Sequence, residues 1–150
     1  MVAEAPVRTW CPQPKQEVFF ERDEDEALYG GAAFGGKSEA LLFFCLARLI
    51  QYPGSSALII RQSYTDLSRE GALIPRSHEV LTGEGKWDGQ LHKWTLPNGS
   101  VLTFGYLAAP SDRYQYQGVS YETIAWDELT QIEREEDYLF VNAFCRSKID

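Results

Sequence analysis

Hydrophobic and polar positions along the chain follow strand-like and helix-like patterns in alternation. Residues 27–29, 57–61 and 122–126 are short apolar runs of the kind that forms buried strands. Residues 38–50 are strongly apolar over a length that suits a helix, and residues 133–148 predict another helix with one apolar face. The pattern therefore predicts strands that are separated by helices.

Two segments between these elements are less regular. Residues 64–81 have an uneven helical pattern, with breaks predicted at Gly71 and Pro75. Alternating apolar runs flank Asn98-Gly99 and predict a β-hairpin over residues 94–104, because an Asn-Gly pair favours a tight turn between antiparallel strands. The chain is thus expected to contain antiparallel as well as parallel strand pairs.

The order of the elements predicts an α/β fold with three layers, in which helices cover both faces of a mostly parallel sheet with an inserted β-hairpin. Residues 1–16 are punctuated by prolines and predict an N-terminal arm, whereas residues 17–150 predict one domain. Residues 112–118 predict a loop before the last strand. Such sheets bind ligands at the carboxyl ends of their strands, so we expect the functional site there.

Composition excludes several classes of protein. Hydrophobic residues make up 44% of the chain and charged residues 24%, which is typical of a globular protein and not of a disordered one. The longest apolar run is too short to cross a bilayer and the N-terminus has no signal pattern, so we expect a soluble, intracellular protein. Cys11, Cys45 and Cys145 are scattered, which predicts reduced thiols and no zinc site, with Cys45 in the core.

The formal net charge of −8 disfavours a chain that binds nucleic acid over its whole surface, because phosphate contacts require clustered cations. Any contact with DNA must therefore be local. The alternative for each cation taken singly is an ordinary solvated position. The candidate contacts are Arg61, Arg69, Arg76, Lys86, His92 and Lys93.

The pattern GxxxxGK[ST], which is typical of a phosphate-binding loop, runs from Gly31 to Ser38. Its glycines allow backbone N–H groups to converge on phosphate oxygens. Lys37 would reach the β- and γ-phosphates, Ser38 would bind Mg²⁺, and the N-terminus of the following helix would face the anion. A Gly-rich turn before an ordinary helix is the alternative. The residues predicted to bind the nucleotide are Gly31, Ala32, Ala33, Phe34, Gly35, Gly36, Lys37 and Ser38.

Two carboxylates follow the apolar strand at residues 122–126. Asp127 at the end of this strand would hold Mg²⁺ together with Ser38, and Glu128 could orient or deprotonate an attacking water. The alternative is a solvated acidic helix start, because Asp and Glu are common in first turns. Downstream of a phosphate-binding loop, the acidic pair favours hydrolysis of a nucleoside triphosphate over simple binding.

Several motifs together resemble the N-terminal ATPase region of the terminase large subunit of tailed bacteriophages, from about Pro12 to the end of the chain. The nucleotide motifs alone occur in many ATPases, whereas the arginine after the second strand and the Gln-Gly before the acidic strand narrow the choice. The motifs are Pro12-Gln13-Pro14-Lys15-Gln16, Leu28-Tyr29-Gly30-Gly31 through Lys37-Ser38, residues 58–67 (LIIRQSYTDL), Tyr116-Gln117-Gly118 and residues 126–131 (WDELTQ).

The resemblance implies a P-loop ATPase of the additional-strand, catalytic-glutamate class, with ATP and Mg²⁺ as cofactors. Such a motor couples ATP hydrolysis to the translocation of double-stranded DNA into a preformed capsid. The implied partners are the portal protein, the small terminase subunit and further copies of the chain in a homo-oligomeric ring, with no membrane. The implied location is the host cell cytoplasm, and transiently the viral procapsid.

The resemblance also implies roles for residues outside the two nucleotide motifs. Gln16 would match an adenine-reading glutamine, since one amide both donates and accepts; the alternative is a surface residue of an irregular arm. Arg61 would be catalytic, by supporting the phosphates or by acting across a subunit interface; the alternative is a strand-end ion pair. Tyr116 to Gly118 would lie near the nucleotide or form a plain turn.

Two departures from the family limit these expectations. Many relatives have an arginine inside the phosphate-binding loop, where this chain has Ala32 and Ala33. The family also continues with a further strand, a lid and a nuclease domain, so we expect a partial ATPase domain with a sheet that is incomplete at its C-terminus. Another P-loop ATPase, such as a helicase-like enzyme, and a catalytically silent nucleotide-binding fragment remain alternative interpretations.

Overall fold

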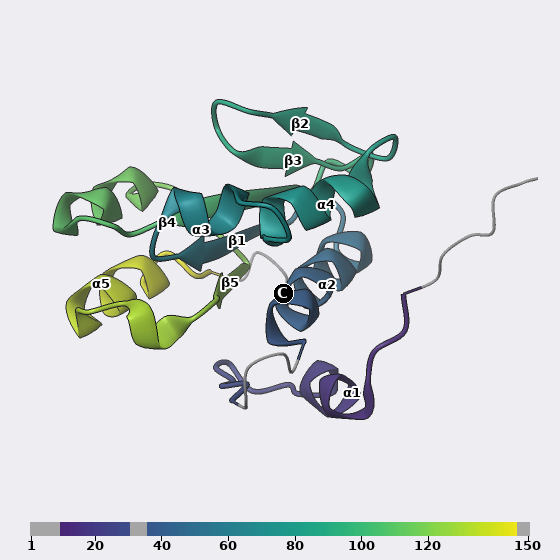
Figure 1. Cartoon of the computed structure of the whole chain (residues 1–150), viewed down its shortest axis with the longest axis horizontal. Coiled ribbons are helices and arrows are strands. Elements are labelled where there is room, and N and C mark those ends of the chain that lie inside the picture. The colour runs from purple at the N-terminus through teal and green to yellow at the C-terminus, as the bar shows by residue number, and fades with distance from the viewer. Residues whose placement is uncertain (1–9, 31–35, 147–150) are drawn as a thin grey trace, which may run out of the picture.

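A computed structural model of the protein describes residues 10–30 and 36–146. Its strands are β1 (Ser56–Arg61), β2 (Lys86–Asp88), β3 (Lys93–Thr95), β4 (Val101–Tyr106) and β5 (Thr123–Trp126). Within the described residues these strands form one sheet with the order β2-β3-β4-β1-β5 (Figure 1). β1 is parallel to both of its neighbours, β4 and β5, whereas β3 is antiparallel to β2 and to β4.

The predicted α/β class is confirmed, but the sheet is mixed and not mostly parallel. The predicted hairpin is present, since β3 and β4 pair on either side of the turn at Asn98-Gly99. Its second strand, β4, is also the parallel neighbour of β1, so the hairpin extends the sheet and is not an insertion. β2 was not predicted, because three residues are too few to show an alternating pattern.

The helices of the described residues lie on both faces of this sheet. The α-helices are α1 (Pro14–Phe20), α2 (Lys37–Gln51), α3 (Tyr64–Ser68), α4 (Leu73–Leu81) and α5 (Glu135–Asn142), and the 3-10 helices are η1 (Pro110–Tyr116) and η2 (Leu129–Gln131). In Figure 1, the β2–β3 pair lies at the top of the molecule and α1 at the bottom.

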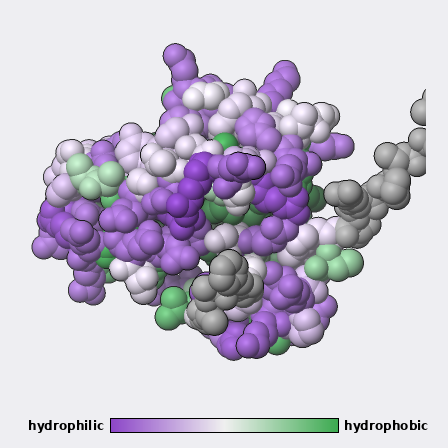
Figure 2. Space-filling view, in the orientation of Figure 1, coloured by the Kyte–Doolittle hydropathy of each residue, from purple (hydrophilic) through white to green (hydrophobic). Residues whose placement is uncertain are grey.

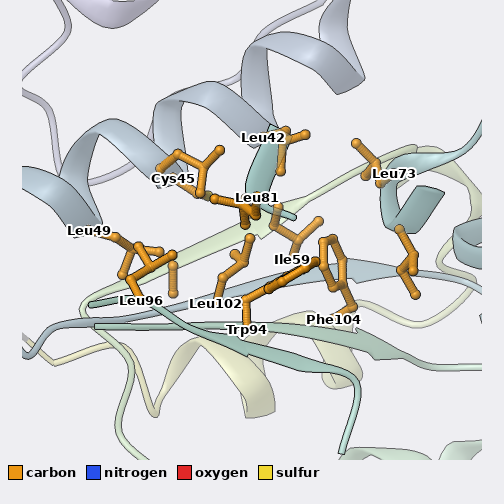
Figure 3. Packing of buried hydrophobic residues seen from close by; sticks show 14 of the residues in the cluster. Leu42, Cys45, Leu49, Ile59, Leu73, Leu81, Trp94, Leu96, Leu102 and Phe104 are labelled. Carbon is orange, nitrogen blue, oxygen red and sulfur yellow. The ribbon is translucent and has the colours of Figure 1, made fainter. Parts of the chain in front are cut away.

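The helix predicted after the phosphate-binding loop is confirmed as α2, and its apolar residues recur at helical spacing. Ala40, Leu42, Cys45, Leu46 and Leu49 are buried along one side of α2. Cys45 is fully buried as predicted, and this burial raises the pKa of its thiol to about 12. The side chains of this stripe reach the sheet in Figure 3, where they meet Ile59, Leu102 and Phe104.

The uneven segment at residues 64–81 forms two helices, α3 and α4, and the chain between them includes Gly71 in the left-handed region. Ser63 caps α3, since its Oγ accepts a hydrogen bond from the Asp66 backbone N–H. The predicted break at Pro75 is wrong. Pro75 is the third residue of α4, where no backbone N–H is needed for an intrahelical bond.

Alternate residues of β1 face two separate cores. Ile59 belongs to the larger core, which lies between the sheet and α2, α3 and α4. Leu58 and Ile60 belong to the smaller core on the opposite face, together with Tyr116 of η1 and Val141 of α5. The predicted layers, with helices on both faces of the sheet, are therefore present.

Three sequence-based predictions of secondary structure differ from the structure. Residues 27–29 form no strand, and most of the predicted loop at residues 112–118 belongs to the 3-10 helix η1. The predicted helix at residues 133–148 is shorter, because α5 ends at Asn142. After α5 the chain turns and pairs with the segment before β5, where Tyr121 N–H donates to Phe144 O and Arg146 N–H donates to Tyr121 O.

The surface drawn in Figure 2 is largely hydrophilic, with hydrophobic side chains in small, separate areas. Across residues 10–30 and 36–146, none of the helices combines the length and the apolar character that crossing a membrane requires.

Candidate functional site

Two side chains that are 89 positions apart in the sequence meet at the N-terminus of α2. Ser38 is the second residue of α2, and Asp127 directly follows β5. The Ser38 hydroxyl lies 2.9 Å from Oδ1 and 3.0 Å from Oδ2 of Asp127 and donates to this carboxylate. The structure thus brings together the two residues that the sequence predicted as Mg²⁺ ligands.

Arg61 completes this group from the neighbouring strand. It is the last residue of β1, which runs parallel to β5, so the ends of both strands lie at the same edge of the sheet. Its Nη1 lies 3.3 Å from Oδ2 of Asp127, and the two side chains are only 12% and 3% exposed. We call these residues the Ser38–Arg61–Asp127 cluster.

The charge of Asp127 is strongly influenced by its surroundings. Burial raises the pKa of this carboxyl group, whereas the hydrogen bond from Ser38 and the positive charge of Arg61 act in the opposite direction. A buried carboxylate is costly unless it is paired and hydrogen-bonded. Ser38 and Arg61 supply that compensation here.

Backbone hydrogen bonds hold both sides of the cluster in place. The Asp127 N–H donates to the carbonyl of Ile60 at 2.9 Å, and the carbonyl of Arg61 accepts from the N–H of Leu107 at 3.2 Å. The main chain at the ends of β1 and β5 is therefore tied into the sheet, and only side chains are left to move.

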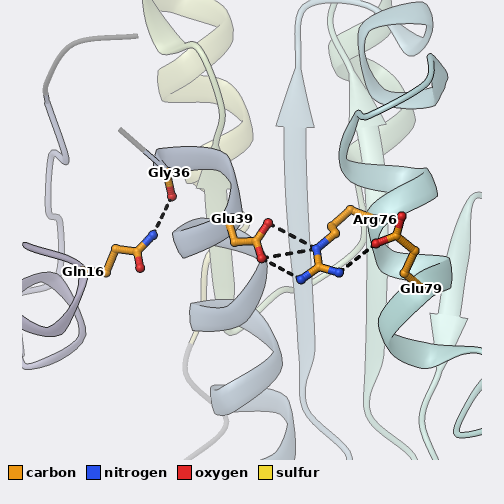
Figure 4. Close-up of polar contacts among 5 residues, drawn as sticks. All are labelled: Gln16, Gly36, Glu39, Arg76 and Glu79. Atoms are coloured by element: carbon orange, nitrogen blue, oxygen red, sulfur yellow. Dashed lines mark hydrogen bonds and ion pairs between the residues drawn. The ribbon is translucent and has the colours of Figure 1, made fainter. Parts of the chain in front are cut away.

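Gln16 connects α1 to the start of α2 (Figure 4). Its Nε2 donates to the carbonyl of Gly36 at 2.9 Å, its Oε1 accepts from the N–H of Gln13 at 2.8 Å, and the residue is 3% exposed. Gln16 is therefore not a surface residue of an irregular arm, but lies beside the end of the predicted phosphate-binding loop. Its reading of adenine stays a prediction.

Part of the predicted loop can be placed. Gly36 has a left-handed backbone with φ 69° and precedes Lys37, the first residue of α2. Glycine suits this position, because other residues adopt positive φ only at a cost. The predicted nucleotide-binding residues Gly31, Ala32, Ala33, Phe34 and Gly35 lie outside the described residues.

Glu128, the predicted catalytic base, is exposed and directly follows the buried Asp127. Its backbone is left-handed, with φ 54° and ψ 51°, which is uncommon for a residue other than glycine. Such strain concentrates at functional sites. The chain therefore turns at Glu128, directly after Asp127, and η2 begins at Leu129.

The oxygen atoms of the cluster suit a hard cation such as Mg²⁺. Mg²⁺ is usually bound through one or two protein oxygens together with phosphates and water. Ser38 and Asp127 supply a hydroxyl and a carboxylate at the N-terminus of a helix, which itself favours an anion. Among the described residues, no group of three or more His, Cys, Asp and Glu side chains is arranged to hold a metal by itself.

The arginines that were considered for DNA contact are already paired with carboxylates. Arg69 lies 3.6 Å from Asp66, and Arg76 bridges Glu39 of α2 and Glu79 of α4 at 2.7 and 2.8 Å (Figure 4). Their positive charge is therefore locally balanced. Contact between DNA and this chain stays a prediction.

A groove of about 570 Å³ lies elsewhere, between the N-terminal segment and the far ends of α2 and α4. Its walls are mostly apolar and include Trp10, Phe20, Phe43, Ile50 and Val80. Of the residues predicted to bind the nucleotide, those that the structure describes (Gln16, Gly36, Lys37 and Ser38) do not line this groove, and its apolar walls are unsuited to a triphosphate.

The ion pair between Arg61 and Asp127 is the strand-end ion pair that the sequence left open as the alternative for Arg61, although the sequence did not name its partner. Tyr116 has a structural place, because its ring packs on Gly105 and its hydroxyl donates to the carbonyl of Tyr106 at 2.9 Å. No local signal in the sequence indicates that contact.

Comparison with known proteins supports the resemblance. No curated protein and no solved structure gives a significant match to the chain. Residues 28–143, which are more than half of the chain, match the model of a family described as terminase large subunit, T4likevirus-type, N-terminal. The predicted motif at Pro12–Gln16 precedes the matched residues. The chain therefore belongs to this family and carries the N-terminal region of a terminase large subunit.

Proposed function

We propose that this chain binds Mg²⁺ and ATP at the N-terminus of α2 and hydrolyses ATP as the motor domain of a DNA-packaging terminase. The observation that carries the proposal is the hydrogen bond from Ser38 to Asp127, which joins the phosphate-loop motif to the acidic strand end. Membership of the terminase family supports it. The P-loop class of the fold is part of this proposal, supported by the parallel strands β4, β1 and β5 between helical layers.

In the proposed complex, backbone N–H groups of residues 31–38 and the ammonium of Lys37 bind the phosphates. Ser38 and Asp127 hold the cation, which when bound neutralises charge on the phosphate oxygens. Gln16 lies beside the loop and offers an amide that matches the adenine edge. Each of its amide atoms makes one bond to the chain in this structure, and the second N–H and the second lone pair of the oxygen are the groups that would contact adenine.

Glu128 is proposed as the general base. Its exposed carboxylate accepts a proton from a water molecule while the water oxygen attacks the γ-phosphorus. The bond between the γ-phosphorus and the bridging oxygen breaks, and ADP departs with the bonding electrons. Asp127 is buried beside Arg61 and keeps its separate role of holding the cation.

The proposed motor moves double-stranded DNA as a ring of identical subunits, with the portal protein and the small terminase subunit as partners. This part of the proposal rests on the family. The net charge of −8 and the ion pairs of Arg69 and Arg76 restrict DNA contact to a small part of this chain.

Thermal unfolding with and without nucleotide tests the proposal. Saturating ATP with Mg²⁺ is expected to raise Tm by about 5 °C or more, because ligand at 100 times its Kd adds about 2.7 kcal/mol and a domain of this size gains about 2 to 4 °C per kcal/mol. Lys37→Ala should remove the shift. An unchanged Tm of the wild-type protein at millimolar ATP and Mg²⁺ would argue against every nucleotide-binding interpretation.

Phosphate release separates hydrolysis from binding. Glu128→Gln should retain the ATP-dependent rise in Tm but lower turnover by about 100-fold or more, the usual contribution of a general base. Unchanged turnover in this variant would exclude Glu128 from the proposed role. A wild-type protein that binds ATP without releasing phosphate would instead support a catalytically silent nucleotide-binding domain.

A further inference from the structure

We propose that Arg61 occupies the cation's place on Asp127 in the nucleotide-free protein, and that Mg²⁺ arriving with a nucleotide displaces it. Arg61 is then a positioning residue that blocks Mg²⁺ from binding alone and turns to the phosphates when both ligands arrive. This inference rests on the proposed function, since it concerns the same site.

Arg61 and Ser38 share one carboxylate oxygen of Asp127. Oδ2 of Asp127 lies 3.3 Å from Nη1 of Arg61 and 3.0 Å from the Ser38 hydroxyl. A cation held between Ser38 and Asp127 must use this same carboxylate. Two positive groups at one carboxylate oxygen repel each other strongly where the surroundings are poor in water, so the guanidinium and the metal ion compete.

Arg61 has an N–H donor that no acceptor among the described residues uses. The Nε of Arg61 is buried, and within the described residues it has no hydrogen-bond partner. A guanidinium carries five N–H groups, and its planar fork matches phosphate oxygens. When Asp127 turns to a metal ion, the phosphates of a bound nucleotide would offer Arg61 a new anionic partner.

The exchange of partners at Asp127 needs no movement of the main chain. The backbone on both sides is fixed by the bonds from Asp127 N–H to Ile60 O and from Leu107 N–H to Arg61 O. Rotation of the Arg61 side chain at the edge of the sheet is therefore sufficient. Binding of the metal and binding of the nucleotide are then coupled, because the metal displaces Arg61 from Asp127 and the phosphates of the nucleotide pair with the displaced guanidinium.

The experiment measures binding of Mg²⁺ in the absence of nucleotide, by calorimetry and by Tm at pH 8. Arg61→Gln removes the competing charge and should bind Mg²⁺ at least about tenfold more tightly than wild type, the effect that one opposite charge has on the proton affinity of a carboxylate. Arg61→Lys keeps a positive charge and should behave as wild type. Arg69→Gln, directly after the following helix α3, is the matched control and should also behave as wild type.

Equal Mg²⁺ affinity of Arg61→Gln and wild type would overturn the inference. The proposed function would survive that result as long as wild-type protein still binds ATP with Mg²⁺. The wild type provides a second test that requires no variant to fold: Mg²⁺ alone should leave Tm unchanged at concentrations at which Mg²⁺ with ADP raises it. An equal shift with Mg²⁺ alone would also overturn the inference.

Discussion

The backbone of Glu128 is the sharpest local irregularity next to the proposed catalytic machinery. Its side chain is exposed, so burial does not explain why a non-glycine residue is held at φ 54°. The chain must turn there because Asp127 is tied to β1 on one side and η2 begins at Leu129 on the other. The strained backbone of Glu128 thus holds an exposed carboxylate next to the Ser38–Arg61–Asp127 cluster.

Substitution of Glu128 by glycine and by alanine tests this strain. Both changes remove the carboxylate, but only glycine relieves the left-handed backbone, so Glu128→Gly should be more stable than Glu128→Ala by about 1 kcal/mol. Chemical denaturation measures the difference. Glu17 of α1 is the control, because in a helix the order reverses and alanine is favoured by about 1 kcal/mol. If the alanine variant were more stable than the glycine variant at both positions, the backbone of Glu128 would be unstrained.

Among the elements, α1 contacts the end of the predicted phosphate-binding loop through the buried side chain of Gln16. Gln16 donates to the carbonyl of Gly36, which also accepts the first intrahelical hydrogen bond of α2 from the N–H of Ala40. A Cβ atom built on Gly36 would lie 2.7 Å from Nε2 of Gln16. The end of the predicted phosphate-binding loop is therefore shaped both by backbone conformation and by contact with α1.

A double-mutant cycle separates these two effects. Gly36→Ala should cost about 1 to 2 kcal/mol from the left-handed backbone alone, and more from the displaced Gln16 amide. With Gln16→Ala in place, the cost of Gly36→Ala should fall by about 0.5 kcal/mol or more. The free energy of unfolding from urea denaturation provides the measurement.

Gly71 is the matched control for this cycle. Its φ is +78°, but a Cβ atom there would meet nothing within 4 Å, so Gly71→Ala carries the strain without the collision. Equal costs at Gly36 and Gly71, with no dependence on Gln16, would exclude a structural link between α1 and the loop.

The elements that the sequence predicted correctly are those with local signals. α2 and β1 are long enough for apolar spacing to identify them, and the Asn-Gly pair identified the β3–β4 hairpin. Residues 27–29 were predicted as a strand from three apolar positions, but a strand also requires a partner. α5 ended early because Phe144 and Arg146 pair with Tyr121, a contact across 23 or more positions that no local pattern reveals.

At the scale of the whole molecule, the candidate site combines elements that are remote in sequence. The meeting of Ser38 and Asp127 could be predicted, because α/β sheets place ligand-binding groups at the carboxyl ends of their strands. The pairing of Arg61 with Asp127 depends on strand order and on side-chain direction, and the burial of Gln16 depends on how α1 packs. These features appear only when the sheet and its helical layers are assembled.

The two faces of the sheet differ in how much apolar surface they bury. α2 contributes four buried residues to the larger core, whereas the buried residues of α5 on the smaller face are only Asp137 and Val141. Asp137 is held by Arg113 of η1 at 3.2 Å, and the remaining side chains of α5 are partly or fully exposed. Local opening should therefore begin at α5 and η1, while β1, with a neighbour on each side and four buried residues, opens last.

Native-state hydrogen exchange measures this order directly. Amides of α5 should exchange at least about tenfold faster than those of α2 and β1, which corresponds to an opening free energy about 1.4 kcal/mol lower. Because Asp127 and Glu128 lie between β5 and η2, bound nucleotide should slow exchange around them and in α2, and leave α5 less affected. Equal protection of α5 and β1 would mean that the domain opens as one unit, and that its smaller core is as strong as its larger one.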